Sequence, residues 1–145
     1  MVITFTAILL GLAALFYPLR RNKFYLLSSA MVIASAYFIE THYFRTSIFS
    51  AKTILLFVVF HLIAINLSTF VAYGVDKKAA QKGSWRISEK DLHSLEFLGG
   101  WIGAWLGQRF FHHKTSKRSY MATYKLMIVM EFAAIYFILK FLGLI

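Results

Sequence analysis

The fold of this chain is decided by residues 84–114, which read SWRISEKDLHSLEFLGGWIGAWLGQRFFHHK. A helix is predicted over Leu92–Phe111, because Ser88 and Asp91 have the spacing of a capping box just before it. Its uninterrupted apolar part, Phe97–Gly107, has eleven residues, or about 16 Å at 1.5 Å per residue. The hydrocarbon core of a bilayer is about 30 Å thick, so this helix is too short for an ordinary crossing and is typical of a re-entrant helix.

Longer apolar runs lie on both sides of this stretch. Of the 145 residues, 59% are apolar and 15% are charged. A soluble domain has roughly a quarter of its residues charged, and a disordered chain has far fewer apolar ones. Four runs are therefore predicted to be transmembrane helices: Val2–Leu19, Phe24–Ile39, Ile54–Val75 and Met121–Ile145.

The basic residues, which give a net charge of +10, gather in loops. Arg20–Lys23, Lys77–Lys90 and Arg109–Arg118 are rich in Lys and Arg, as cytoplasmic loops are. All three share one face only if the short helix re-enters the membrane. We therefore predict an all-α integral membrane protein with four transmembrane helices plus one Gly-rich re-entrant or short helix. Both termini and the loop with Glu40, Arg45 and Lys52 would then lie outside. The alternative has five transmembrane helices.

One compact membrane domain is expected, with an N-terminal transmembrane hairpin over residues 1–50 and a core over 51–145. The hairpin is predicted because only residues 20–23 separate the first two runs. Residues 76–86 are expected to form a basic loop before the short helix. There is no cysteine, so disulfides and thiolate metal sites are excluded.

A motif along the second half of the chain resembles a known family. It comprises Tyr73-Gly74-Val75-Asp76-Lys77, Trp85-Arg86, Glu89, Leu92-His93, Leu98-Gly99-Gly100-Trp101, Gln108-Arg109 and His113-Lys114-Thr115. Over about Tyr73–Tyr120 the chain resembles the small bacterial membrane proteins grouped as domain of unknown function 1294. The resemblance implies an integral protein of the bacterial cytoplasmic (inner) membrane, and it implies no activity.

Basic side chains on both sides of the short helix are the first candidate site. Arg86 and Arg109 would offer bidentate forks to a phosphate, and Lys77, His113 and Lys114 would add positive charge or donors. The hypothesis is that they bind a lipid headgroup or another phosphorylated ligand. The alternative is that they only orient the protein and attract anionic lipid. Nucleic acid is not the expected partner, since no RNA-binding motif occurs.

Polar side chains at bilayer depth are the second candidate site. Glu131 interrupts the last apolar run, and His61 and Asn66 lie in the third. A carboxylate at this depth is costly and should find an internal partner. We therefore predict a polar network of His61, Asn66 and Glu131, which would be structural or would carry protons or ions.

The short helix has two further patterns. Gly99, Gly103 and Gly107 recur every fourth residue, a stripe that lets a second backbone approach closely. Packing within the monomer is expected, with a homo-oligomer or a backbone-lined ligand path as alternatives. His93 and Glu96 share a helical face three residues apart. That spacing could serve a metal, but an interfacial polar face is favoured, and neither a metal nor a cofactor is predicted.

Three function classes follow. The first is an inner-membrane protein that binds anionic lipid or a phosphorylated ligand through its basic cytoplasmic face. The second is a small transporter or channel that uses His61 and Glu131. The third is a membrane-embedded lipid-modifying enzyme with His93, Glu96 or Asp76 as acid or base. We favour the first class, because it requires the least specific arrangement of residues. Whether the protein is an enzyme stays open.

Overall fold

The computed structural model describes residues 21–42, 51–141 and 143, and every element in those ranges is helical. The long helices are α3 (Lys23–His42), α4 (Ala51–Lys82) and α7 (Arg118–Phe141). Between α4 and α7 lie α5 (Glu89–Leu95), the π-helical turn η1 (Glu96–Gly100) and α6 (Trp101–Phe111). The predicted first span, Val2–Leu19, and the outer loop with Arg45 lie outside the described residues.

Helix α4 is longer than predicted, because it continues through Asp76 to Lys82. The prediction of a basic loop over residues 76–86 is therefore wrong for residues 76–82, which belong to α4. The helix ends at Gly83, whose φ of 62° lies in the left-handed region that favours glycine. The amide of Ser84 closes the helix end by donating to the carbonyl of Ala79 at 3.0 Å. The extra turns place Asp76 inside the fold rather than in a loop.

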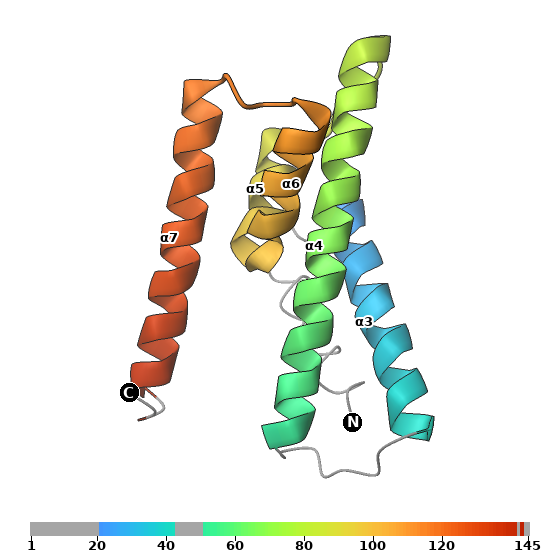
Figure 1. The fold of residues 1–145 in the computed structure, drawn as a ribbon, viewed down its shortest axis with the longest axis vertical. Helices are drawn as coiled ribbons and strands as arrows, with labels where there is room; N and C mark the ends of the chain where they lie inside the picture. The colour runs from blue at the N-terminus through green and yellow to red at the C-terminus, as the bar shows by residue number, and fades with distance from the viewer. Residues whose placement is uncertain (1–20, 43–50, 142, 144–145) are drawn as a thin grey trace.

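The predicted single helix over Leu92–Phe111 is a helical hairpin. The chain enters through α5, reverses at η1 and returns through α6, and Figure 1 shows α5 and α6 side by side. The reversal is built on Gly99, whose φ of 102° is unfavourable for residues with a Cβ atom. The predicted N-cap is confirmed, since Ser88 Oγ accepts the amide of Asp91 at 3.1 Å. Helical periodicity could not show this break, because the apolar pattern continues through it.

The glycine stripe packs inside the monomer, against α4. A Cβ atom on Gly103 would overlap the backbone of Asn66, and one on Gly107 would crowd the side chain of Tyr73. Helix α4 therefore lies directly on α6, and it packs against α3 as well. Helix α7 packs on η1 and α5, and its Tyr120 and Tyr124 also reach Tyr73 of α4 and the carbonyl of Trp101 in α6. Small residues at such contacts are typical of helix packing in membranes.

Three segments far apart in the sequence meet at one end of this bundle. Asn22, just before α3, donates through Nδ2 to the carbonyl of Asp91 at 2.8 Å and to Ser94 Oγ at 3.0 Å. Lys117, just before α7, donates to both carboxylate oxygens of Glu89 at 2.8 and 3.0 Å. The starts of α3 and α7 are therefore tied to α5, whereas the last turns of α4 extend beyond the hairpin (Figure 1).

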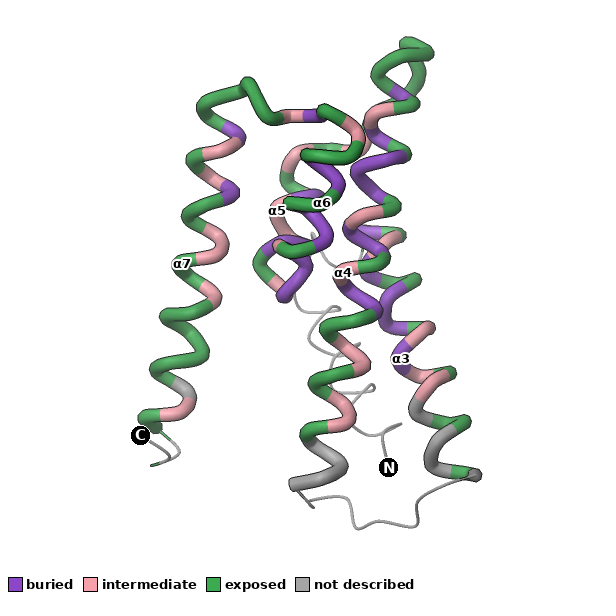
Figure 2. The backbone as a smooth tube through the Cα atoms, in the orientation of Figure 1, coloured by how far each residue is buried: buried purple, intermediate pink, exposed green. Residues whose placement is uncertain are grey.

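The other end of the bundle exposes apolar side chains. Figure 2 shows α7 and the first half of α4 mostly exposed or intermediate, and their surface includes Leu55, Ile63, Val129, Phe132 and Phe137. Leu55–Lys82 and Arg118–Phe141 are long and apolar enough to cross a membrane. The core helix of a soluble protein would instead be mostly buried.

Gly103→Ala is expected to destabilise the fold by about 1–3 kcal/mol, because the added methyl group would collide with the backbone of Asn66. Gly74→Ala is the matched control, since its methyl group would meet the ring of Phe111, which can rotate away. Both changes give a helical glycine the same gain in helix propensity. Thermal unfolding of the purified protein in detergent should show a clearly larger loss for Gly103→Ala. Equal losses would contradict the close α4–α6 contact.

Candidate functional site

A buried carboxylate, Asp76, organises the basic end of the bundle. Its Oδ2 accepts Nε2 of His113 at 2.8 Å and lies 3.3 Å from both Arg86 Nη2 and Lys114 Nζ. Its Oδ1 accepts the amide of Ile87 at 3.1 Å. Because the side chain of Asp76 is fully buried, these donors replace water. One residue of α4 thereby holds the segment before α5 and the loop after α6.

The loop after α6 has an unusual backbone that makes this contact. His112 and Lys114 have φ values of 46° and 59°, in the left-handed region that non-glycine residues seldom adopt. The amide of His113 donates to the carbonyl of Gln108 at 3.1 Å, which ends α6. The turn directs His113 and Lys114 back toward Asp76. The ion pairs with Asp76 offset the cost of the two left-handed residues, which is roughly 1–2 kcal/mol each.

A second buried carboxylate, Glu96, lies in the π-helical turn. Its Oε1 accepts the hydroxyl groups of Tyr73 at 2.5 Å and Tyr120 at 2.8 Å, and its Oε2 bonds Nδ1 of His93 at 2.5 Å. The two tyrosine hydroxyls are 2.6 Å apart, and Gln108 donates to that of Tyr73 at 3.2 Å. The cluster thus joins α4, α5, η1, α6 and α7 through one carboxylate.

The two carboxylates form one polar centre. Nζ of Lys114 lies 4.6 Å from the ring centroid of Tyr120, and His93 stacks on the same ring at 4.3 Å. Asp76 and Glu96 bring two negative charges, and Arg86 and Lys114 bring two positive charges. The centre has both of these positive side chains already paired with Asp76. It is therefore suited to holding helices together rather than to binding an anion.

An exposed ion pair closes the outer side of this centre. Glu89 lies in the first turn of α5 and binds Lys117, with Lys114 3.7 Å away. The ammonium group of Lys117 lowers the pKa of the Glu89 carboxyl group. Glu89 therefore stays ionised, and the tie between α5 and α7 persists, until the pH falls below the ordinary range of a glutamate.

The five residues of the predicted phosphate site are divided by the structure. Arg86, His113 and Lys114 converge on Asp76. Lys77 is the next residue of α4, about 100° further around the helix, and forms no ion pair with any described residue. The guanidinium group of Arg109 lies 4.8 Å from the ring centroid of Trp105 on α6. The structure therefore does not bring all five residues into one pocket.

The three residues predicted to lie at bilayer depth meet the hairpin reversal rather than each other. Nε2 of His61 lies 2.9 Å from the carbonyl of Leu98, and Nδ2 of Asn66 donates to the carbonyl of Gly99 at 2.9 Å. Oδ1 of Asn66 accepts the amide of Gly103 at 2.6 Å. Glu131 approaches Gly99 from α7, and its buried Oε2 has no hydrogen-bond partner. His61 and Asn66 thus satisfy backbone groups at the reversal, and Glu131 does not.

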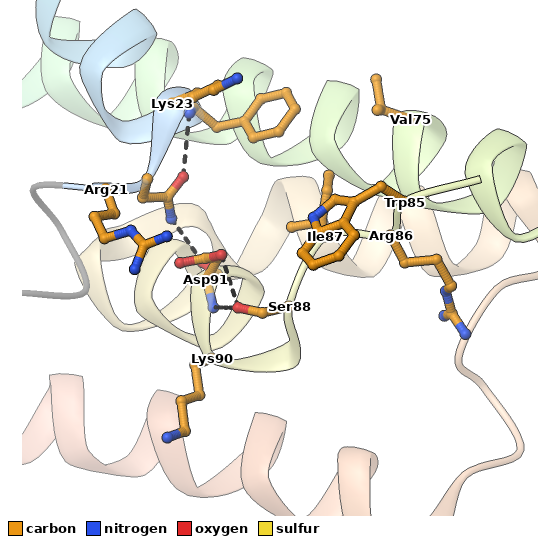
Figure 3. A pocket seen from close by; sticks show the side chains of 11 residues that line it. Arg21, Lys23, Val75, Trp85, Arg86, Ile87, Ser88, Lys90 and Asp91 are labelled. Atoms are coloured by element: carbon orange, nitrogen blue, oxygen red, sulfur yellow. Dashed lines mark hydrogen bonds between the residues drawn. The ribbon is translucent and has the colours of Figure 1, made fainter.

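A pocket of about 650 Å³ opens on the opposite side of α5, between the starts of α3 and α5 and the end of α4. Figure 3 shows the exposed Lys23 and Lys90 at its edges and Trp85 and Ile87 on its wall. The polar centre anchors this wall, because Asp76 binds Arg86 and the amide of Ile87. No three His, Asp or Glu side chains lie close enough to hold a metal ion anywhere in the described ranges.

Comparison with known proteins identifies the family. The family described as "Protein of unknown function (DUF1294)" matches residues 66–120. The "Uncharacterized protein YsdA" of Bacillus subtilis (strain 168) is 41% identical over 71 residues, which are 49% of this chain and 80% of that protein. The chain belongs to the DUF1294 family. No solved structure matches it.

The DUF1294 segment contains the whole polar centre. Tyr73, Asp76, Arg86, His93, Gln108, His113 and Lys114 all belong to the motif that suggested the family, and the structure brings them together. Sequence reasoning missed Tyr120 and did not join His93–Glu96 to Tyr73, because these residues lie on different helices. It also missed the role of Asn22. A buried tyrosine or asparagine leaves no periodic signal that could have revealed these contacts.

Asp76→Asn is expected to destabilise the protein by about 3–5 kcal/mol, because Arg86 and Lys114 lose their buried counter-charge. Glu89→Gln is the matched control, since Glu89 also approaches Lys114 but is 42% exposed. Its loss should cost at most about 1 kcal/mol. The measurement is thermal unfolding of both variants in the same detergent. A loss of stability in Glu89→Gln that equals or exceeds the loss in Asp76→Asn would contradict the central role of Asp76.

Proposed function

We propose that this DUF1294 protein is a multi-pass protein of the bacterial inner membrane that binds anionic lipid through its basic cytoplasmic end. The observation that carries the proposal is that polar contacts tie three basic segments together, while the outer surface of α7 and of the first half of α4 is largely apolar. Asn22 ties the first segment to α5, Asp76 joins the second to the third, and Lys117 ties the third to Glu89. Cytoplasmic loops have this charge bias, and the cytoplasmic leaflet is anionic.

The hairpin supports a re-entrant topology. Both ends of the α5–α6 hairpin lie where α4 ends and α7 begins, so a single face of the membrane would hold all of them (Figure 1). The reversal at Gly99 would lie at membrane depth, where exposed backbone groups are costly. His61 and Asn66 satisfy the freed carbonyls of Leu98 and Gly99 there. With the predicted span Val2–Leu19, the chain would have four crossings and one re-entrant hairpin.

A transporter or channel is the weaker candidate. It is supported by Glu131, whose Oε2 is buried and unpartnered beside the hairpin reversal. His61 and Asn66, however, use their polar atoms to bind the backbone of that reversal. They therefore have less capacity to line a path for ions.

Topology is tested with single cysteines, which the cysteine-free chain allows without background. In the re-entrant arrangement, Lys82→Cys and Ser116→Cys should react with a membrane-impermeant maleimide only from the cytoplasmic side. Arg45→Cys should react only from the outer side. Labelling of Ser116→Cys from the outer side, with Lys82→Cys cytoplasmic, would show that the α5–α6 segment crosses the membrane and would overturn the proposed topology.

Anionic lipid is expected to raise the thermal stability of the protein, because a ligand that binds only the folded state stabilises it. The measurement compares the unfolding temperature in nanodiscs of phosphatidylcholine alone and with increasing phosphatidylglycerol. A rise that shrinks at high salt would fit charge attraction at the basic end. Equal stability in both lipids, with no anionic lipid co-purifying, would refute lipid binding.

A further inference from the structure

The pocket beside α5 combines positive charge with an apolar wall. Its lining residues are Arg21, Asn22, Lys23, Phe24, Val75, Trp85, Arg86, Ile87, Ser88, Lys90 and Asp91. Four of these carry positive charge and one carries negative charge. The carboxylate of Asp91 already accepts the hydroxyl of Ser88 at 2.7 Å. Arg86 is already paired with Asp76, so the positive charge that the pocket adds comes from its other basic residues, among them the exposed Lys23 and Lys90.

The cations of the pocket differ in how far they are engaged. Lys23 and Lys90 are exposed and form no ion pair with any residue that the structure describes. Arg86 binds Asp76 through Nε and Nη2, yet its side chain is 50% exposed. A guanidinium group has five N–H donors, so Arg86 keeps donors for a second acceptor. Lys23 and Lys90 lie at opposite edges of the pocket and do not point toward each other (Figure 3), so these long side chains would turn inward to meet a phosphate at its mouth.

The apolar side of the pocket points to a lipid rather than to a free phosphate. Phe24, Val75 and Ile87 line it, and Trp85 is 96% exposed at its edge. An indole this exposed is unusual for a soluble surface but is typical of the bilayer interface, where its ring meets the headgroup region. A soluble phosphate would leave this apolar surface in water. A lipid would cover it with its glycerol and the first part of its acyl chains.

The shape of the pocket is fixed before any ligand arrives. Asn22 binds the carbonyl of Asp91 and the hydroxyl of Ser94, which joins the start of α3 to α5. Asp76 fixes Arg86 and the amide of Ile87 on the opposite wall. Both walls are therefore held by buried polar contacts, and little conformational freedom would be lost on binding.

We infer that this pocket is a specific site for one anionic glycerophospholipid, whose phosphodiester lies between Lys23 and Lys90 at the two edges, with Arg86 and Trp85 on the wall. The inference rests on the proposed function, because it needs the basic end to lie at a membrane surface. It moves the binding residues away from His113 and Lys114, which serve Asp76. The bulk attraction of the basic loops for anionic lipid is a separate effect, and it needs no pocket.

The test is native mass spectrometry of full-length protein released from nanodiscs that contain phosphatidylglycerol and phosphatidylcholine. The wild type should retain one phosphatidylglycerol. Lys23→Gln combined with Lys90→Gln should lower the affinity for that lipid by about 100-fold, since each lost charge-assisted contact to the phosphodiester contributes about ten-fold. Lys78→Gln combined with Lys82→Gln is the control, because it removes the same charge from exposed positions of α4 outside the pocket.

Trp85→Ala provides a second variant that changes no charge. This variant should also retain less phosphatidylglycerol. Because the side chain of Trp85 is almost fully exposed, its removal should not disturb the fold. Soluble glycerol 3-phosphate, added to protein in detergent, distinguishes the source of the phosphate. A lipid site should bind it far more weakly than the lipid. Tight binding that is lost in the Lys23/Lys90 variant, with no retained lipid, would overturn the lipid as occupant.

The remaining outcomes separate the inference from the proposed function. Equal retention by the Lys23/Lys90 variant and its control, with phosphatidylglycerol still stabilising both proteins, would overturn the pocket and leave lipid binding by the basic end intact. Absence of retained lipid together with absence of stabilisation would overturn both. Loss in the Lys23/Lys90 variant alone would support both.

Discussion

The structure depends on the burial of Asp76 in the interior of the bundle's basic end. A carboxylate without water must be matched by donors and opposite charge. Here those partners come from before α5 and from the loop after α6. The requirement forces the two ends of the α5–α6 hairpin to the same side of the fold. The direction of the hairpin, and with it the placement of the basic loops, follows from satisfying this single group.

Glu96 extends the same constraint to α7. The carboxylate lies fully buried in the π-helical turn and receives hydroxyl groups from α4 and α7 and an imidazole from α5. Helix α7 has few other contacts with the described fold. The position of α7 therefore depends strongly on Tyr120 and on the neighbouring contacts of η1. Because Arg86 and Lys114 are both paired with Asp76, the centre supports the architecture, while the exposed Lys23 lies outside it at the start of α3.

The two sides of α5 have different roles in this account. His93 stacks on Tyr120 of α7 and binds Glu96, while the carbonyl of Asp91 and the hydroxyl of Ser94 bind Asn22 on the side of α3. The DUF1294 segment, residues 66–120, includes the polar centre but not Lys23 or the start of α3. The proposed lipid pocket thus combines a wall from the family segment with a wall from the N-terminal half of this chain.

The sequence by itself determined the helical class, the positions of most apolar helices, the N-cap at Ser88 and the family, because periodicity, composition and local motifs act over a few residues. It also indicated that the short Gly-rich stretch is special. Only the tertiary structure decided that this stretch reverses at Gly99, that α4 continues past Asp76, and that Arg86, His113 and Lys114 meet one carboxylate. Those outcomes depend on which donors reach a buried charge in space, and the spacing of residues along a chain does not contain that information.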